Sequence, residues 1–218
     1  MENQSLEAVL EQGVIVIVRG VAPRHILATV EALYEGGIRA MEVTFNHKNQ
    51  QTVEESLECM RLIREHFKSD LYMGAGTVLT PQQVEAAAQC GAGYIISPNV
   101  DAEVIHRTKE LGCHSFPGAL TPTEAVSGYM AGADAIKLFP AGNMGASYMK
   151  AIMAPLSHIP FLAVGGIYPE NMKEFMDIGV KGFGVGGGLI DHKAIAAGDF
   201  KGMTELAGRY ISIWQKNR

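Results

Sequence analysis

The chain has 218 residues, 47% of them hydrophobic and 19% charged, and its formal net charge is −5 at pH 7. This ordinary globular composition excludes a disordered or fibrous chain, and the length suits one domain spanning residues 1–218. The acidic balance and the scattering of the Lys and Arg residues argue against a nucleic-acid-binding surface. No apolar run is long enough to span a membrane, and the N-terminus lacks the pattern of a signal peptide, so we expect a soluble cytoplasmic protein without a membrane partner.

Taken in chain order, residues 1–12 are predicted to form a first helix and residues 200–216 a last one. Between them, eight short apolar runs predict eight strands: VIVIVRG (14–20), AMEVTF (40–45), LYMGAGT (71–77), YIISP (94–98), HSFPG (114–118), AIKLFP (135–140), FLAVGG (161–166) and GFGVGG (182–187). The intervening amphipathic segments begin at Pro or capping residues at 22–25, 80–83, 121–124 and 168–171. Most of them end at glycines, at 36–37, 91–93, 112, 132–133 and 179.

Nearly continuous apolar strands, each followed by a helix, predict a parallel sheet covered by helices. Eight such units in this length favour an α/β fold of the (β/α)8 TIM-barrel type with an extra N-terminal helix. An open doubly wound sheet is the alternative, but no glycine-rich dinucleotide turn follows the first strand. The barrel is therefore the predicted architecture.

In such a barrel the functional groups lie at the carboxyl ends of the strands. Because side chains alternate along a strand, Arg19, Glu42 and Lys137 are all expected to point into the barrel. Their neighbours on the same strands are expected to pack outward against the helices: Met41, Val43, Ile136 and Leu138. The sequence thus predicts that one carboxylate, one lysine and one guanidinium share a confined space.

Lys137 is the most informative of these residues, because it lies inside an apolar strand and cannot easily extend to solvent. Burial and a nearby cation disfavour the ammonium form, and a neutral amine is what attack on a ketone requires. Glu42 is suited to transfer protons beside it. The alternative is a structural Lys–Glu ion pair that closes the barrel mouth. Arg19 is placed to bind a carboxylate, although it also suits a packing role.

Glycine pairs follow the last two predicted strands. Gly165 and Gly166 precede a predicted helix start, and Gly186 and Gly187 precede LIDH. Exposed backbone N–H groups at these two strand ends are typical of phosphate sites in barrels. In GAGT at 74–77, the glycines are expected to relieve crowding, and the Thr77 hydroxyl is a candidate ligand donor.

Metal or disulfide chemistry finds little support in the sequence. The three cysteines, Cys59, Cys90 and Cys113, are far apart and form no CxxC pair, so we expect small buried side chains in a reducing compartment. The seven histidines show no metal-ligand spacing, and we predict no metal.

Motifs along essentially the whole chain resemble one family: EVTFN (42–46), GAGTVLTPQQ (74–83), SPN (97–99), FPG (116–118), IKLFPA (136–141) and AVGGIYPENM (163–172). In order and spacing they are similar to the class I aldolases that act on 2-keto-3-deoxy-6-phosphogluconate (KDPG) or 4-hydroxy-2-oxoglutarate (KHG). The resemblance implies that Lys137 forms the Schiff base and that Glu42 is the acid–base group. It also implies that Arg19 and Thr77 hold the keto-acid carboxylate and that the phosphate is held by Gly165, Gly166, Gly186 and Gly187.

The same resemblance implies cleavage of KDPG to pyruvate and glyceraldehyde 3-phosphate, with 4-hydroxy-2-oxoglutarate, split to pyruvate and glyoxylate, as a second substrate. It implies no cofactor, a homotrimer, and a place in carbohydrate metabolism through the Entner–Doudoroff route. Two departures bear on the substrate. Many members carry Arg where this chain has Asn46, and some that act on the galacto epimer carry Asn, so the C4 configuration stays open. Members often have Ser where this chain has Gly187, which removes one hydroxyl contact.

Two other functions fit the same residues. A sugar-phosphate isomerase or epimerase would use Glu42 as base and Lys137 as an electrostatic stabiliser, without cleaving a C–C bond. A non-catalytic barrel that binds a phosphorylated metabolite would show no turnover, but it has no need of a reactive amine.

Overall fold

A computed structural model describes residues 6–218 of the chain. Within them, nine strand segments form a parallel sheet: β1 Val14–Val18, β2 Ala40–Thr44, β3 Tyr72–Gly76, β4 Tyr94–Ile96, β5 His114–Phe116, β6 Gly118–Ala119, β7 Ile136–Leu138, β8 Phe161–Val164 and β9 Gly182–Val185. Each of the eight predicted runs contains one strand, except that the fifth is divided into β5 and β6 at Pro117. Proline has no N–H to donate to the sheet, which accounts for the break.

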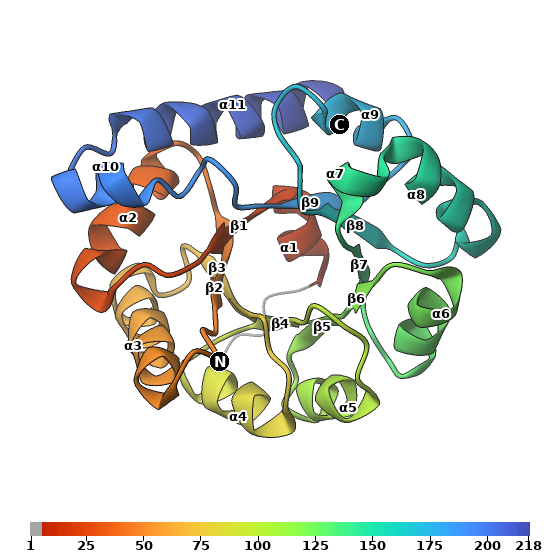
Figure 1. Ribbon diagram of the computed structural model, residues 1–218, viewed down its shortest axis with the longest axis horizontal. Coiled ribbons are helices and arrows are strands. Elements are labelled where there is room, and N and C mark those ends of the chain that lie inside the picture. Colours follow the sequence, from red (N-terminus) through yellow and green to blue (C-terminus); the bar gives the residue numbers. More distant parts are fainter. Residues whose placement is uncertain (1–5) are drawn as a thin grey trace.

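The strand order closes the sheet into a barrel. It runs β5-β4-β3-β2-β1-β9-β8-β7-β6, and its two ends are the halves of that one interrupted strand. Helices surround the strands on the outside (Figure 1). The predicted TIM-barrel fold is confirmed, and the doubly wound alternative is wrong.

The helices are α1 Leu6–Gln12, α2 Pro23–Glu35, α3 Gln50–Phe67, α4 Pro81–Gln89, α5 Ala102–Glu110, α6 Pro122–Met130, α7 Ala141–Met144, α8 Ala146–Met153, α9 Met172–Met176, α10 His192–Ala197 and α11 Lys201–Asn217, with a 3₁₀ turn, η1, at Ala154–Leu156. The predicted starts at 22–25, 80–83 and 121–124 are confirmed, and the first helix is confirmed from residue 6, since residues 1–5 lie outside the described part. The predicted terminal glycines at 37, 91, 112, 132 and 179 all have positive φ.

One predicted helix start is wrong. Helix α9 begins at Met172 and not at the YPEN segment of residues 168–171. The Asn171 side chain accepts a hydrogen bond from the Tyr168 N–H (2.8 Å) and donates one to the Gly166 carbonyl (2.9 Å). These bonds hold the segment in a turn and delay the helix, because Asn side chains compete for the backbone groups that a helix would use.

The alternation of side chains divides the core into two layers. The outer layer lies between strands and helices and includes Val16 together with Met41, Val43, Ile136 and Leu138, the four residues predicted to pack outward. The inner layer fills the barrel and is made mainly by Ile15, Ala40, Tyr94, Ile96, Phe116, Ala135, Leu162 and Val164, with Val9 of α1 joining it. Helix α1 therefore covers one end of the barrel (Figure 1), and the carboxyl ends of the strands form the other.

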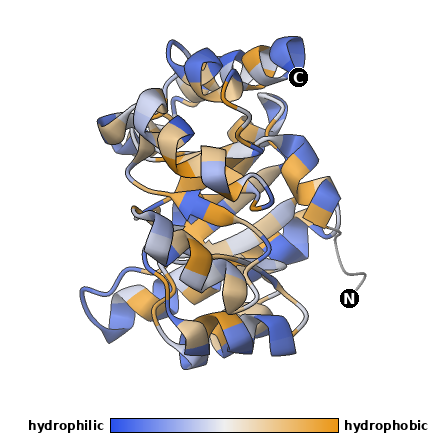
Figure 2. Cartoon of the chain, turned by 90° about the vertical axis from the view of Figure 1, so that its right-hand side faces the viewer, coloured by the Kyte–Doolittle hydropathy of each residue, from blue (hydrophilic) through white to orange (hydrophobic). Residues whose placement is uncertain are grey.

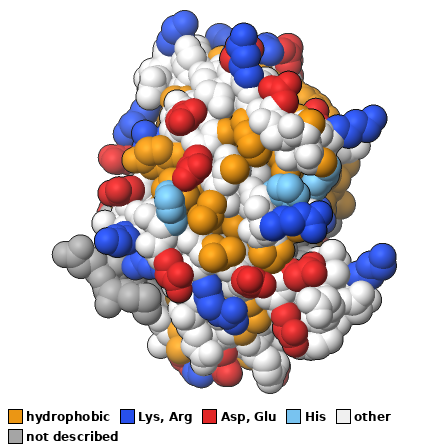
Figure 3. Space-filling view, turned by 90° about the vertical axis from the view of Figure 1, so that its left-hand side faces the viewer, with side chains coloured by type: hydrophobic (Ala, Val, Ile, Leu, Met, Phe, Trp, Pro, Cys, Tyr) orange, Lys and Arg blue, Asp and Glu red, His pale blue; other side chains and the backbone are white. Residues whose placement is uncertain are grey.

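The surface of the barrel is mixed in character. Hydrophobic residues concentrate on the strands and inner helix faces, and hydrophilic residues lie toward the outside (Figure 2). On the face shown in Figure 3, acidic and basic side chains are interspersed and form no area of a single sign. None of the helices in residues 6–218 combines the length and apolarity needed to cross a membrane. The three cysteines are free and buried, as predicted.

Candidate active site

Two charged side chains are buried inside the barrel mouth. Lys137 lies in the middle of β7 and is 7% exposed, and Glu42 lies in the middle of β2 and is 2% exposed. Their sequence neighbours Ile136 and Met41 pack outward, so strand alternation directs both charged groups into the barrel. Oε2 of Glu42 is buried without a hydrogen-bond partner among the described residues. Leaving such an acceptor unsatisfied costs about 1–3 kcal/mol, so Glu42 is a candidate for contact with a ligand.

Burial moves both groups toward their neutral forms. It raises the pKa of Glu42, although the positive charges of Lys137 and Arg19 act in the opposite direction. Burial likewise lowers the pKa of Lys137; Glu42 opposes this effect and Arg19 adds to it. Removing a charge from water costs more here than the partner returns. The pair therefore offers an amine that can be neutral and a carboxyl group that can hold a proton.

Glycines on β3 make room for the Glu42 carboxylate and for the aromatic ring beneath it. A side chain at Gly76 of β3 would overlap the Glu42 carboxylate, and one at Gly74 would overlap the ring of Tyr94. The Tyr94 hydroxyl donates to the Met41 carbonyl (2.6 Å) and fixes this ring as the floor of the site. Nζ of Lys137 lies 4.9 Å from the centre of the Phe139 ring. The glycines of GAGT thus relieve crowding, as the sequence predicted.

Arg19 and Thr77 are brought together beside the pair. The Arg19 guanidinium donates to the Thr77 hydroxyl (3.4 Å), and its charge acts on both Glu42 and Lys137. Thr77 has a φ of 57°, which is uncommon for a residue other than glycine and is often found at functional sites. The two residues predicted to bind a carboxylate are therefore in contact with each other.

A hydrogen-bonded chain fixes the backbone of Thr77. Nε2 of His47 lies 2.8 Å from the Thr77 carbonyl, and Nδ1 lies 3.3 Å from Nε2 of Gln83. Since Oε1 of Gln83 accepts from the Leu79 N–H (2.8 Å), its amide group faces His47 as a donor. Nδ1 of His47 is then the acceptor, and Nε2–H donates to Thr77. His47 therefore supports the positive φ of Thr77.

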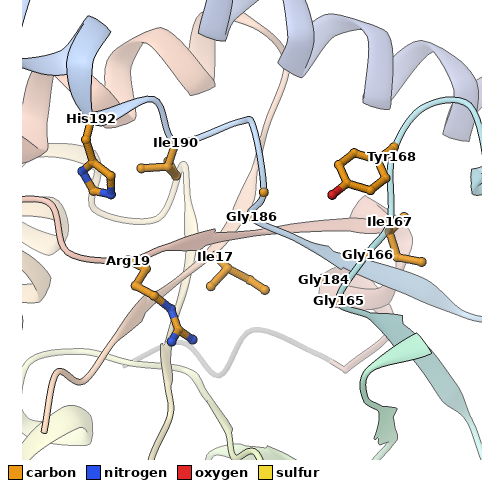
Figure 4. A pocket seen from close by; sticks show the side chains of 11 residues that line it. Ile17, Arg19, Gly165, Gly166, Ile167, Tyr168, Gly184, Gly186, Ile190 and His192 are labelled. Atoms are coloured by element: carbon orange, nitrogen blue, oxygen red, sulfur yellow. The ribbon is translucent and has the colours of Figure 1, made fainter. Parts of the chain in front are cut away.

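A cavity of about 310 Å³ adjoins this site at the ends of β1, β8 and β9. All four predicted phosphate-binding glycines line it, together with the remaining lining residues: Ile17, Arg19, Ile167, Tyr168, Gly184, Ile190 and His192 (Figure 4). The sequence predicts a helix directly after Gly165 and Gly166, but none of the four glycines is followed directly by a helix. Helix α9 begins only at Met172 and α10 only at His192. The N–H groups of the glycines belong to turns, where positive φ at Gly165 (84°) and Gly166 (68°) favours glycine over larger residues.

The predicted site residues thus form two adjacent groups. Glu42 and Lys137 lie deep in the barrel, the four glycines line the cavity, and Arg19 belongs to both groups. Asn46 lies outside the cavity. Its Oδ1 accepts from the Lys48 N–H (3.1 Å), so its side chain is held by its own loop.

Three further residues of this region were not singled out from the sequence: His47, Tyr168 and His192. Tyr168 lies just after a strand-end glycine pair, and this position in the sequence could have indicated that it lines the site. The two histidines lie in loop or helix-start positions, where no periodicity predicts their direction. Among residues 6–218, no three His, Cys, Asp or Glu side chains come together as a metal site would require.

Comparison with known proteins agrees with the geometry. The family model described as KDPG and KHG aldolase matches residues 6–206. The 2-dehydro-3-deoxy-6-phosphogalactonate aldolase of Escherichia coli strain K12 is 40% identical over 176 residues, 80% of this chain and 83% of that protein. The KHG/KDPG aldolase of the same organism is 32% identical over 206 residues, 93% of each chain.

Solved structures show the same relationship. A structure described as native KDPGal superposes with a TM-score of 0.83 at 34% identity, covering 94% of this chain and 95% of that one. The KDPG aldolase of Legionella pneumophila, with pyruvate captured as a covalent carbinolamine intermediate, has a TM-score of 0.82 at 28% identity, covering 93% and 96%. With a lysine and a carboxylate buried in the mouth of a (β/α)8 barrel and this match across its length, the chain belongs to the KDPG and KHG aldolase family.

Proposed function

We propose that Lys137 is the Schiff-base nucleophile of a class I aldolase that cleaves a 2-keto-3-deoxy-6-phospho sugar acid into pyruvate and glyceraldehyde 3-phosphate. The observation that carries the proposal is the burial of Lys137, with its lowered pKa, beside Glu42 at the carboxyl ends of the strands. The pyruvate carbinolamine captured in the Legionella relative supports the same chemistry.

The reaction begins with attack of the neutral Lys137 amine on the C2 ketone. Glu42 delivers a proton to the carbinolamine hydroxyl, which leaves as water and produces a protonated imine. Arg19 and Thr77 bind the adjacent carboxylate and hold the imine in the plane that aligns the C3–C4 bond for cleavage. A carboxyl group with a raised pKa is suited to give this proton near neutral pH.

Cleavage uses the imine as an electron sink. Glu42, now ionised, takes the proton of the C4 hydroxyl, the C3–C4 bond breaks, and its electrons move to the imine nitrogen. Glyceraldehyde 3-phosphate leaves, and the enamine on Lys137 is protonated at C3. Water then hydrolyses the resulting imine, which releases pyruvate and restores the amine. Meanwhile the N–H groups of Gly165, Gly166, Gly186 and Gly187 bind the phosphate in the cavity.

The names of the relatives bear on the configuration of the substrate at C4. The relative at 40% identity and another at 35%, from Rhizobium meliloti, carry the galactonate name, and the latter name is qualified as probable. We therefore place the galacto epimer first, with KDPG, which the sequence favoured, as the second candidate supported by the 32% relative. The Lys48 N–H holds Oδ1 of Asn46 in its own loop, and the amide NH₂ group of Asn46 has no hydrogen-bond partner among residues 6–218 and can donate to a substrate hydroxyl.

The test is a comparison of the two epimers and of 4-hydroxy-2-oxoglutarate as substrates. Pyruvate release is measured in an assay coupled to lactate dehydrogenase. Cleavage of one phosphorylated epimer with a kcat/KM at least tenfold above the other would identify the substrate. Absence of pyruvate from all three would overturn the proposed activity.

We also propose that the protein is a single-domain, cytoplasmic homotrimer that acts in the Entner–Doudoroff route. Light scattering on the purified chain tests the trimer directly, because a monomer of 23.5 kDa differs threefold in mass from its trimer.

A further inference from the structure

Tyr168 is an exposed aromatic residue that the catalytic steps do not use. It follows Gly165, Gly166 and Ile167 in the loop after β8, lines the 310 Å³ cavity, and is 50% exposed. Its position is fixed, because its N–H donates to Asn171, and Asn171 in turn donates to the Gly166 carbonyl. The loop therefore holds the tyrosine and a cavity-lining glycine in one fixed unit.

The Tyr168 hydroxyl reaches across the cavity to the opposite glycine turn. A Cβ placed on Gly187 would lie 3.7 Å from this oxygen, in ordinary van der Waals contact, so the phenol oxygen lies directly beside the Gly187 turn. Figure 4 shows the ring directed from the β8 loop toward the turn at Gly186. The hydroxyl has no hydrogen-bond partner within residues 6–218, which leaves it available to a ligand.

The other residues of the cavity define what this ligand is. Apart from glycines and isoleucines, the described lining side chains are Arg19, Tyr168 and His192, and no carboxylate is among them. Backbone N–H groups, a guanidinium and a phenol are all hydrogen-bond donors, which together suit a phosphate with several acceptor oxygens. Tyr168 supplies the one hydroxyl of this set.

We propose that Tyr168 donates a hydrogen bond from its hydroxyl to the substrate phosphate, across from Gly187, and so determines the preference for phosphorylated over unphosphorylated 2-keto acids. The inference rests on the proposed function, because it assigns a further contact within that phosphate site. A hydrogen bond to a charged group in such a site corresponds to about a tenfold change in affinity.

The test is Tyr168→Phe, which removes the oxygen and keeps the ring. We expect kcat/KM for the phosphorylated substrate to fall about tenfold, with less than a twofold change for the same keto acid lacking its phosphate. The inhibition constant of inorganic phosphate should rise by a similar factor. Tyr129→Phe is the control for the exchange itself, since Tyr129 packs on His158 outside the cavity and should leave all three values unchanged.

A second variant tests the position of the hydroxyl. Gly187 has space for a side chain in ordinary contact with Tyr168, so Gly187→Ser is tolerated and brings a hydroxyl to the same region. The double variant Tyr168→Phe/Gly187→Ser should recover at least part of the lost affinity, and Tyr168→Phe/Gly187→Ala should not. An unchanged phosphate inhibition constant in Tyr168→Phe overturns the inference. If instead the wild-type protein released no pyruvate from any substrate, the proposed function would fail, and the phosphate constants, measured by direct binding, would still decide the role of Tyr168.

Discussion

The two halves of the barrel mouth are built in opposite ways. At β2 and β7 the site consists of charged side chains, Glu42 and Lys137, taken out of water. At β8 and β9 it consists of glycine turns around an open cavity, with Arg19 at the boundary. Burial changes protonation states, which chemistry on a ketone requires, while exposed N–H groups bind an anion without changing charge. In the proposed mechanism the first half carries the reaction and the second binds the phosphate, so variants in each half should affect different kinetic constants.

The largest effect is expected from Lys137→Met. Without the amine no imine can form, and kcat/KM should fall on the order of 10⁴-fold or more in the pyruvate-release assay. The variant should still fold, but it should lose stability in urea unfolding at pH 7, because Glu42 is left buried without the positive charge of Lys137. The raised pKa of Glu42 means that this loss becomes smaller as pH falls and the carboxyl group is protonated. Lys216→Met, at the exposed end of α11, is the matched control and should change neither quantity. Residual activity within tenfold of wild type would contradict the assignment of the nucleophile.

The next largest effect is expected from Glu42→Gln, which keeps the shape of the side chain and removes its proton transfer. We expect kcat to fall about 10²- to 10³-fold, with KM changed much less, because the group acts on the reacting atoms and not on the bound anion. Glu205→Gln on the exposed side of α11 provides the comparison. A variant with reduced affinity and an unchanged kcat would place Glu42 in the recognition half instead.

In the glycine half, Gly166→Ala should act on binding. Gly166 has a φ of 68°, so a Cβ strains the turn by about 1 kcal/mol and displaces its N–H. We expect KM for the phosphorylated substrate to rise about tenfold, in contrast with the effect on kcat from Glu42. Gly179→Ala is the control for backbone strain, since Gly179 has a similar φ of 89°, nothing within 4 Å and no place in the cavity. It should keep its KM and lose less stability than Gly166→Ala, whose added Cβ would also lie 3.1 Å from the Gly142 Cα. Equal KM changes in both variants would contradict a binding role.

The smallest effect concerns pH and the residue at the boundary. The positive charge of Arg19 helps to lower the pKa of Lys137, so its removal raises that pKa. Adduct formation with pyruvate needs the neutral amine and is lost as pH falls through the pKa of Lys137. In Arg19→Gln the midpoint of this loss should therefore move to higher pH, measured by borohydride trapping across a pH series. A midpoint that stays in place or moves to lower pH would show that Arg19 does not act on the lysine.

Much of the fold and half of the site could be predicted from the sequence. Side chains alternate between the two faces of a strand, and the apolar neighbours Met41 and Ile136 pack in the outer layer. This alternation predicts that Glu42 and Lys137 point into the barrel. The glycine pairs could be predicted from their place after the last two strands, and positive φ explains the need for glycine at Gly165 and Gly166.

The other features of the site depend on single side-chain contacts in loops, which leave no periodic pattern in the sequence. The start of α9 is delayed by hydrogen bonds of one Asn171 side chain, and the same bonds fix Tyr168. The role of His47 depends on Gln83, which lies 36 positions away in the chain. Side chains in loops take directions set by such single contacts, and these follow only from coordinates.

The most direct test of the central claim is the mass of the intact protein after incubation with pyruvate and sodium borohydride, followed by peptide mapping. We expect one reduced pyruvate adduct, located on Lys137 and missing from Lys137→Met. A folded protein that forms no adduct, or forms it on another lysine, would contradict the Schiff-base mechanism and favour isomerase chemistry on the same barrel.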